Sequence, residues 1–365
     1  MGVARQYRVA IVGGGYAGFT LARELDPHVD VTLIEAREAF VMTPATLRVS
    51  VEPALLDRIV IPYDRLLKRG RVVRGRATVI DEGAVLLADG TRVEAEAIVV
   101  ATGSHYAAPF KPQDDSIAAF KEALLNASRQ ITQSDNVVIV GTGAVGVELA
   151  GEIKTAYPGK SVTLVGDQPQ LFPMYTERLH QELTKRLAAI GVALRLNCPV
   201  SGLKQTNAPF EGEVTLADGT NLSGLIVPAI GARVVSSPAH DLPGTRPQPN
   251  GQLAVDAWLR PSKLANVFVM GDLAATGDGM TVVATAKHVP WLKKALLGLA
   301  NGKDAERLPP YKGWRIPPIL VPLGPKLGVS VLPLGKKGMT VGNWVTSKIK
   351  GKKQFIPRYH KEFNR

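Results

Sequence analysis

The chain has 365 residues, 45% of them hydrophobic, and a formal net charge of +12 at pH 7. This length allows two or three domains with substantial cores, and no run of about 18 apolar residues lacks both charge and proline, which excludes a membrane-spanning helix. One cysteine in the whole chain excludes a redox disulfide, and no zinc, iron–sulfur or haem spacing occurs, so we expect no metal site.

The N-terminus carries no targeting signal that we recognise. Arg8 opens the first apolar strand without a preceding apolar segment, so no signal peptide is expected. Gly2 is present for myristoylation, but Gln6 stands where Ser or Thr is needed, so no acylation is expected.

A first dinucleotide-binding fingerprint follows the apolar strand 9–12. It consists of Gly13, Gly14, Gly15, Tyr16, Ala17 and Gly18. A second apolar strand, 31–35, ends in Glu35, 17 residues after the last glycine. In such a βαβ unit the glycines allow a tight turn, close approach of backbone N–H groups to a pyrophosphate, and packing of helix on strand. We expect the helix N-terminus to bind phosphate and Glu35 to accept hydrogen bonds from a ribose diol.

A strand at 97–100 leads into the small-residue turn that contains Thr102 and Gly103. Further along, the apolar strand 266–270 ends in Gly271 and Asp272. Small polar residues end many strands, but their order beside the fingerprint predicts that both turns complete the first cofactor site.

A second fingerprint lies 128 residues after the first, with Gly141, Gly143 and Gly146 following the strand 137–140. Gly231 ends a segment, 226–231, that repeats the pattern of the turn at 101–103, so the second unit is interpreted as a duplicate inserted into the first. The N-terminal unit is expected to hold a flavin dinucleotide, and the inserted unit a nicotinamide dinucleotide.

The second unit differs from the first at the ribose position. Gly166 stands where Glu35 stands in the first unit, and Asp167 follows it. The glycine removes a carboxylate that would repel a 2′-phosphate, yet no nearby Arg or Lys would bind one, so NADH and NADPH both stay open.

Two further side chains of the second unit are considered for chemistry. Glu148 occupies the position that matches Thr20 of the first unit, and a carboxylate there is expected to point past the phosphates toward the nicotinamide and flavin rings. The alternative is ordinary placement of an acid near a helix N-terminus. Cys198 is interpreted as a small buried hydrophobic residue.

Residues 301–365 hold 14 Lys and Arg against 3 Asp and Glu, so nearly all of the net charge lies there. We expect the proline-broken apolar segments 316–325 and 329–335 to form an apolar surface beside this charge. Apolar plus basic surface attracts anionic membranes. A solvated capping domain is the alternative, and no motif supports specific nucleic-acid binding.

The two fingerprints and the segments 40–52 and 146–158 carry a family resemblance over residues 7–300. The chain resembles the two-dinucleotide-binding-domain flavoproteins related to glutathione reductase and type II NADH dehydrogenases, and within them the ferroptosis-suppressor and apoptosis-inducing-factor-like group. The resemblance implies FAD, with NADH or NADPH as co-substrate. It also implies that the Arg48 side chain contacts FAD, that the Ala77 backbone meets the adenine, and that Asp272 bonds the ribitol. Lys350 would approach the flavin and quinone, with Lys348 or Lys352 as alternatives.

The predicted fold class is α/β, with two Rossmann-like domains and a small C-terminal α+β segment. We expect an FAD-binding domain from residues 1–112 and 241–300, an NAD(P)H-binding domain at 113–240, and a basic quinone- and membrane-facing domain at 301–365.

The predicted function is an NAD(P)H:quinone oxidoreductase that transfers hydride to flavin N5 and then electrons to a quinone in a ping-pong cycle, with Glu148 and Lys350 as catalytic residues. The protein would be cytoplasmic, peripherally associated with membranes, and a homodimer is compatible with the sequence. The alternatives are a reductase of a small iron–sulfur protein, or a redox-sensing binding protein similar to apoptosis-inducing factor.

Overall fold

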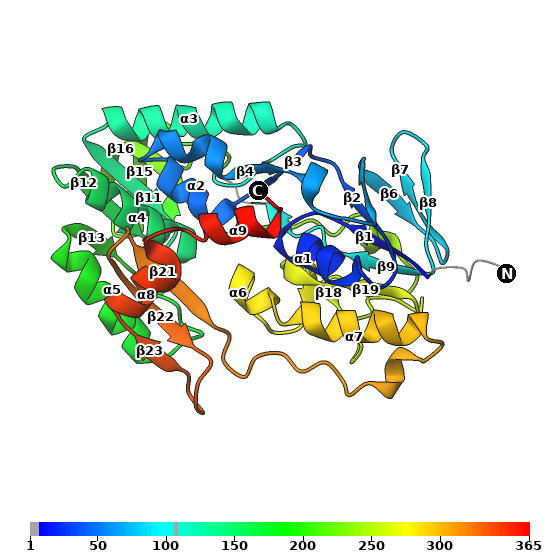
Figure 1. Ribbon diagram of the computed structural model, residues 1–365. Coiled ribbons are helices and arrows are strands. Elements are labelled where there is room, and N and C mark those ends of the chain that lie inside the picture. The colour runs from blue at the N-terminus through cyan, green and yellow to red at the C-terminus, as the bar shows by residue number, and fades with distance from the viewer. Residues whose placement is uncertain (1–6, 106–108) are drawn as a thin grey trace.

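The computed structural model describes residues 7–105 and 109–365. Gly2 and Gln6, on which the acylation expectation depends, lie outside the described residues. Figure 1 shows two α/β bodies side by side, with a smaller sheet of C-terminal strands below the left-hand body. The α/β class with two Rossmann-like domains is confirmed, because each body contains parallel strands on both sides of the strand that precedes its glycine fingerprint.

The first sheet is parallel throughout, in the order β19-β9-β1-β2-β5. Val9 pairs with Val31 on one side and Ala97 on the other. Strands buried on both faces need continuous apolar sequence, which is what the segments around Val9 and Val31 supply. The five strands are β1 (Arg8–Val12), β2 (Asp30–Glu35), β5 (Arg71–Arg74), β9 (Ala97–Val100) and β19 (Val267–Val269).

Helices and small sheets surround this first sheet. Helix α1 buries Phe19, Ala22 and Leu25, whose spacing of three forms one apolar face. The helices here are α1 (Tyr16–Leu25), α2 (Thr43–Val49), α6 (Val282–Thr285) and α7 (His288–Ala300). The small sheets are β3 (Ala39–Val41) with β4 (Val60–Pro62), β6 (Ala77–Ile80) with β7 (Ala84–Leu87) and β8 (Arg92–Glu94), and β18 (Leu253–Ala254) with β20 (Ala274–Ala275).

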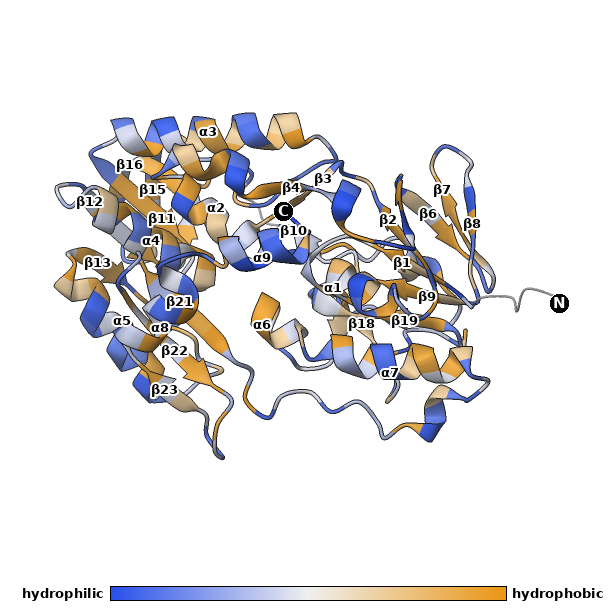
Figure 2. Cartoon of the chain, in the orientation of Figure 1, coloured by the Kyte–Doolittle hydropathy of each residue, from blue (hydrophilic) through white to orange (hydrophobic). Residues whose placement is uncertain are grey.

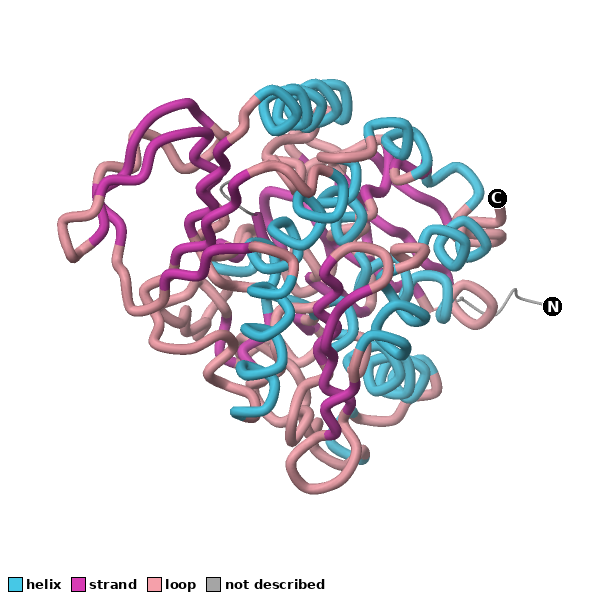
Figure 3. The backbone as a smooth tube through the Cα atoms, turned by 90° about the vertical axis from the view of Figure 1, so that its left-hand side faces the viewer, coloured by secondary structure: helices cyan, strands magenta, loops and turns pink. Residues whose placement is uncertain are grey.

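The second sheet has the order β13-β12-β11-β16-β15-β14, parallel as far as β16 and antiparallel beyond it. Its strands are β11 (Asn136–Val140), β12 (Ser161–Val165), β13 (Val192–Arg195), β14 (Val200–Ser201), β15 (Phe210–Leu216) and β16 (Asn221–Pro228). Its helices are α3 (Ile117–Gln133), α4 (Ala144–Ala156) and α5 (Glu177–Ala189). In the view turned by 90°, α3 is seen nearly end on above the strands (Figure 3). The pair β10 (Ser104–His105) and β17 (Arg233–Val234) joins the two bodies.

The C-terminal region forms an antiparallel sheet of β21 (Ile319–Leu323), β22 (Leu327–Leu332) and β23 (Met339–Val341). Then follow α8 (Asn343–Thr346), a π-helical turn (Ser347–Gly351) and α9 (Ile356–Glu362). Strand β21 packs against α4, and β22 packs against α5. The Figure 2 colouring shows β22 as mainly hydrophobic.

This packing corrects one expectation from the sequence. The apolar segments around β21 and β22 were expected at the surface, but every residue of β21 and the centre of β22 are buried. The apolar strands are used to fasten the C-terminal region to the second domain. Among the described residues, no helix combines the length and the apolar character needed to cross a bilayer.

Candidate active site

The first glycine turn is shaped by contacts that only glycine permits. Gly13 has a φ of +105°, and a Cβ there would lie 2.5 Å from the Ala101 carbonyl oxygen. A Cβ on Gly18 would lie 1.9 Å from the Gly13 oxygen. Gly15 precedes α1 without any side-chain cap, and nothing lies within 4 Å of where its Cβ would be. The start of this helix therefore lines a pocket beside open space, and a helix N-terminus suits an anionic group.

Glu35 lies at the end of β2 and lines the same pocket. Its Oε2 accepts a hydrogen bond from the Gly14 N–H at 2.6 Å, and its Oε1 accepts from the Arg37 Nε at 3.0 Å. The Tyr63 hydroxyl donates to the Gly14 oxygen at 2.8 Å. Oε1 also accepts from the Arg37 backbone N–H at 3.0 Å, so Oε2 is the oxygen that keeps a second lone pair, and the ribose contact remains a prediction.

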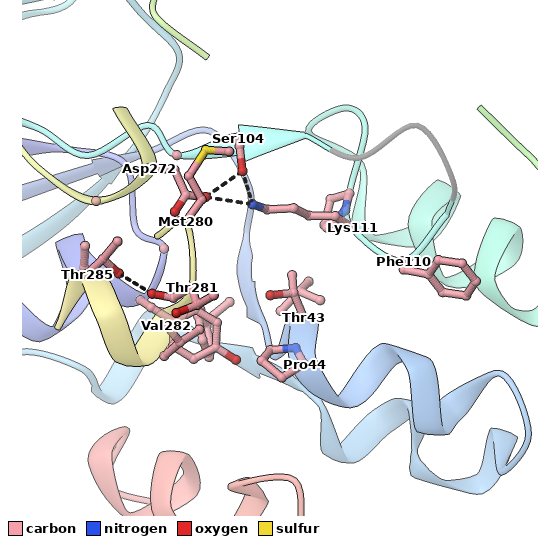
Figure 4. A pocket seen from close by; sticks show the side chains of 18 of the residues that line it. Thr43, Pro44, Ser104, Phe110, Lys111, Asp272, Met280, Thr281, Val282 and Thr285 are labelled. Carbon is pink, nitrogen blue, oxygen red and sulfur yellow. Dashed lines mark hydrogen bonds and ion pairs between the residues drawn. The ribbon is translucent and has the colours of Figure 1, made fainter. Parts of the chain in front are cut away.

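The pocket lining also contains a polar cluster of Ser104, Lys111 and Asp272, shown in Figure 4. Ser104 Oγ donates to Asp272 Oδ2 at 2.6 Å, and Lys111 Nζ donates to Ser104 Oγ at 2.9 Å. Burial lowers the pKa of Lys111 below its usual value. Thr102 donates its hydroxyl to the Val235 oxygen, so this part of the pocket lining is also joined to the second domain. The cluster orients Asp272 where it lines the pocket.

The turn that carries Asp272 is fixed from behind by a buried network. The Gly271 N–H donates to His288 Nδ1 at 3.0 Å, which leaves His288 Nε2 to donate to Asp278 Oδ2 at 3.3 Å. Asp278 also accepts from the Tyr311 hydroxyl at 2.7 Å and the Trp314 N–H at 2.6 Å. Burial acts to raise the pKa of Asp278, but these hydrogen bonds outweigh it and lower the pKa to about 2.

Glu148 and Lys350 meet at the pocket. Lys350 Nζ, from the π-helical turn, lies 2.7 Å from both carboxylate oxygens of Glu148 on α4. Both residues are buried and both line the pocket. Burial raises the pKa of Glu148 to about 7, although the Lys350 ammonium opposes the rise. A carboxyl with a pKa near neutrality can both take and give a proton at physiological pH.

The structure also decides among the tail lysines. Lys350 is the buried one, whereas Lys352 is exposed. Lys348 Nζ lies over the ring of the exposed Trp344, 4.8 Å from its centroid. Lys350 is therefore the tail lysine that the fold brings to the pocket.

Arg48 is not among the residues that line the pocket. Its guanidinium lies against Glu152, with Nε 2.5 Å from Oε2 and Nη2 2.8 Å from Oε1. Burial raises the pKa of Glu152, and Arg48 opposes this rise. Ala77, expected to meet the adenine, pairs with Leu87 of β7 and also lies outside the pocket lining.

A second pocket surrounds the second fingerprint and is lined by Gly141, Gly143 and Gly231. Gly146 lies behind it, because a Cβ there would lie 1.9 Å from the Gly141 oxygen. Its position matches that of Gly18 behind the first turn.

The ribose end of this pocket differs from the sequence-based picture. A Cβ on Gly166 would lie 2.3 Å from Thr142 Oγ1, so the glycine is required by packing. Asp167 is exposed and lines the pocket. Cys198 also lines the pocket and is half-buried, not buried in the core as expected.

Helix α4 and the glycine turn before it contribute to different pockets. Gly141 and Gly143 before it line the second pocket, while Ala144, Val145 and Glu148 line the first. A dinucleotide bound along the second turn could therefore reach the first pocket past the start of this helix. Glu148 would lie at that meeting point.

Several site residues were missed from the sequence. Lys111, Ser104 and Phe355 line the first pocket without belonging to any motif. Glu152 could have been found, because it lies four residues after Glu148 and so shares its helix face.

The residues present fit two dinucleotides. In each fingerprint there is open space beside one glycine, because nothing lies within 4 Å of where a Cβ would be on Gly15 or on Gly143. The first pocket adds Asp272, Glu35 and a largely apolar wall suited to an aromatic ring system.

Comparisons with known proteins agree with this geometry. The family described as Pyridine nucleotide-disulphide oxidoreductase matches residues 7–288. The chain is 30% identical to apoptosis-inducing factor homolog B of Dictyostelium discoideum, over 98% of this chain and 97% of that protein. It is 28% identical to human ferroptosis suppressor protein 1, over 95% and 93%. The sulfide:quinone oxidoreductase of Aquifex aeolicus superposes with a TM-score of 0.74 at 16% identity, covering 98% of this chain and 91% of that chain.

Proposed function

The chain belongs to the pyridine nucleotide-disulphide oxidoreductase family, and on that premise we propose that it is an NAD(P)H:quinone oxidoreductase. It is an FAD-dependent oxidoreductase with NAD(P)H as the electron donor. When bound, FAD accepts a hydride from NAD(P)H and passes two electrons to the acceptor.

The electron acceptor is inferred from the absence of a second cysteine and from the apolar lining of the first pocket. The sequence has one cysteine, so no pair of thiols within the chain can take the electrons, and they leave the cofactor directly. A quinone needs two electrons and two protons to become a quinol. The pocket is partly walled by apolar residues such as Ile319 and Leu320, which suit a quinone ring.

The Glu148–Lys350 pair is the observation that carries this proposal. Glu148 has a pKa of about 7 because of burial, so it can supply and recover a proton at neutral pH. Lys350 Nζ, held 2.7 Å from Glu148, places a positive charge where a developing quinol oxygen would be stabilised. Both side chains line the first pocket, and Glu148 stands on the helix that follows the glycine turn of the second pocket.

We further propose that a lipid quinone reaches this site from an anionic membrane surface. The C-terminal region supplies the charge, and its exposed apolar side chains are Leu334, Met339, Trp344 and Ile349. These residues, not the buried strands β21 and β22, are the candidates for contact with lipid. Basic residues near an anionic bilayer each contribute about 1 kcal/mol.

The deciding experiment measures steady-state oxidation of NADH by the purified holoenzyme with a short-chain quinone. Sustained turnover supports the proposal. Stoichiometric reduction of the flavin without turnover would favour a redox-sensing binding protein, and turnover only with a small iron–sulfur protein would favour the reductase alternative.

A further inference from the structure

Arg48 is buried at the junction of three parts of the molecule. It lies near the end of α2, and its side chain is 9% exposed. Its guanidinium bonds both oxygens of Glu152 on α4, and its Nη2 also donates to the Gly351 oxygen at 3.0 Å. One side chain thus joins the first domain, the second domain and the tail residue that directly follows Lys350.

A second tail residue meets the same carboxylate. Gln354 Nε2 donates to Glu152 Oε1 at 3.3 Å, and the Gln354 N–H donates to the Lys350 oxygen at 2.8 Å. Gln354 and Phe355 have φ values of +46° and +61°, a left-handed conformation that residues other than glycine rarely adopt. This kink directs the chain so that Phe355 lines the first pocket.

We propose that Arg48 is a positioning residue that fastens tail residues 350–355 to α4 and so holds Lys350 against Glu148, without binding the cofactor itself. Glu152 is the shared acceptor that makes this possible, because it lies one helical turn after Glu148 on the same face of α4. The inference rests on the proposed function in that Glu148 and Lys350 are its active pair, but neither of its two readouts needs a quinone.

The chemistry of the junction explains why arginine occupies this position. A planar guanidinium can bond both oxygens of one carboxylate and still offer a third N–H to a carbonyl, whereas an ammonium on a flexible stem cannot hold that geometry. Loss of either charge would leave the other buried and unpaired. The tail segment would then be held mainly by Lys350 itself.

Two variants test the inference, Arg48→Lys and Glu152→Gln, each in the FAD-bound full-length protein. The second removes the charge of the acceptor without removing its oxygen, so the inference stays testable if the first variant folds poorly. Glu362→Gln is the matched control. Glu362 is also in the tail and accepts from Arg358 at 2.8 Å, but it touches neither Lys350 nor Glu152.

The first readout is hydrogen–deuterium exchange of residues 347–355 together with the flavin-to-protein ratio. In both test variants we expect exchange of this segment to rise about tenfold or more while the flavin ratio stays that of the wild type. Loss of flavin in Arg48→Lys with unchanged exchange would make Arg48 a cofactor ligand and overturn the inference. An equal rise in Glu362→Gln would also overturn it.

The second readout is the pH profile of flavin reduction by NADH under anaerobic conditions, which needs no quinone. The Lys350 charge lowers the pKa of Glu148, so displacing Lys350 in Arg48→Lys, which keeps the positive charge at position 48, should move that pKa, and with it the profile, upward by about one unit. Glu152→Gln also removes a charge that raises the pKa of Glu148, so this readout is taken from Arg48→Lys alone. An unmoved profile in Arg48→Lys would contradict a positioning role. Absence of quinone turnover in the wild type would overturn the proposed function but leave both of these readouts interpretable.

Discussion

Lys350 Nζ lies 2.7 Å from both carboxylate oxygens of Glu148, although 202 positions separate the two residues in the chain. The contact joins the tail to the helix that begins at the second glycine turn. It brings together the two residues that the sequence suggested for chemistry, while their catalytic roles remain predictions.

Glu148→Gln should keep the fold and the flavin but reduce quinone reductase activity by about a hundredfold, because general acid–base groups contribute factors of that order. Burial raises the pKa of Glu148 to about 7, so the wild-type kcat should change with pH near 7. This pH dependence should be absent in the variant. The measurement is kcat against pH, with Glu182→Gln on the surface of α5 as the control. Unchanged kinetics in Glu148→Gln would return the residue to a structural role.

Asp167 should make NADH the preferred donor. It is the one charged side chain lining the second pocket within residues 7–105 and 109–365, and a carboxylate repels a 2′-phosphate. Asp167→Asn should raise kcat/KM for NADPH relative to NADH by about tenfold, equivalent to about 1.4 kcal/mol. The control is Asp218→Asn, an exposed carboxylate of the same domain that does not line the pocket. A ratio that does not move would assign the discrimination to another group.

Asp278→Asn should lower the free energy of unfolding at pH 7 by on the order of 2 kcal/mol, since a pKa lowered to about 2 represents roughly that much stabilisation of the carboxylate. The contribution is present above the unfolded pKa of about 4 and is lost as the pH falls through 2. Urea unfolding of wild type and variant should therefore converge at low pH. Asp57→Asn, whose side chain is 88% exposed, should change little at any pH.

Intact protein should bind anionic vesicles at low salt, and Trp344→Ala should weaken that binding. Trp344 is 73% exposed and lies beside Lys348, which combines apolar and basic character at one place. Screening over about 8 Å at physiological ionic strength should weaken the binding further. Co-sedimentation measures it, with Val79→Ala, another exposed apolar residue, as the control. No binding at low salt would leave the basic tail without a membrane role.

The sequence predicted the parts of the fold that depend on local pattern. Both glycine turns follow from a pattern of six residues after an apolar strand, and Gly13 and Gly141 have the positive φ values that such turns require. The sequence does not determine which tail lysine reaches the pocket, because no local feature distinguishes Lys348, Lys350 and Lys352 in a lysine-rich segment.

The rest depends on tertiary packing that local patterns do not encode. The segments of β21 and β22 are predicted from the sequence to form an apolar surface, because the sequence does not show that α4 and α5 cover them. The contact between Arg48 and Glu152, which lies 104 positions away, has no local signal in the sequence. Lys111 belongs to no sequence motif, and its place in the pocket is recognised only from its contacts with Ser104 and Asp272.

The contacts around Glu152 and Glu148 span 104, 202 and 303 positions of the chain. Contacts between such distant segments incur their loop-closure entropy before they yield any stabilisation, so they are expected to form late in folding. The contacts of the first glycine turn with β2 span 21 positions, so this part of the turn can form earlier. During refolding, flavin binding should therefore return before turnover does, and the interval between the two would report the docking of the tail.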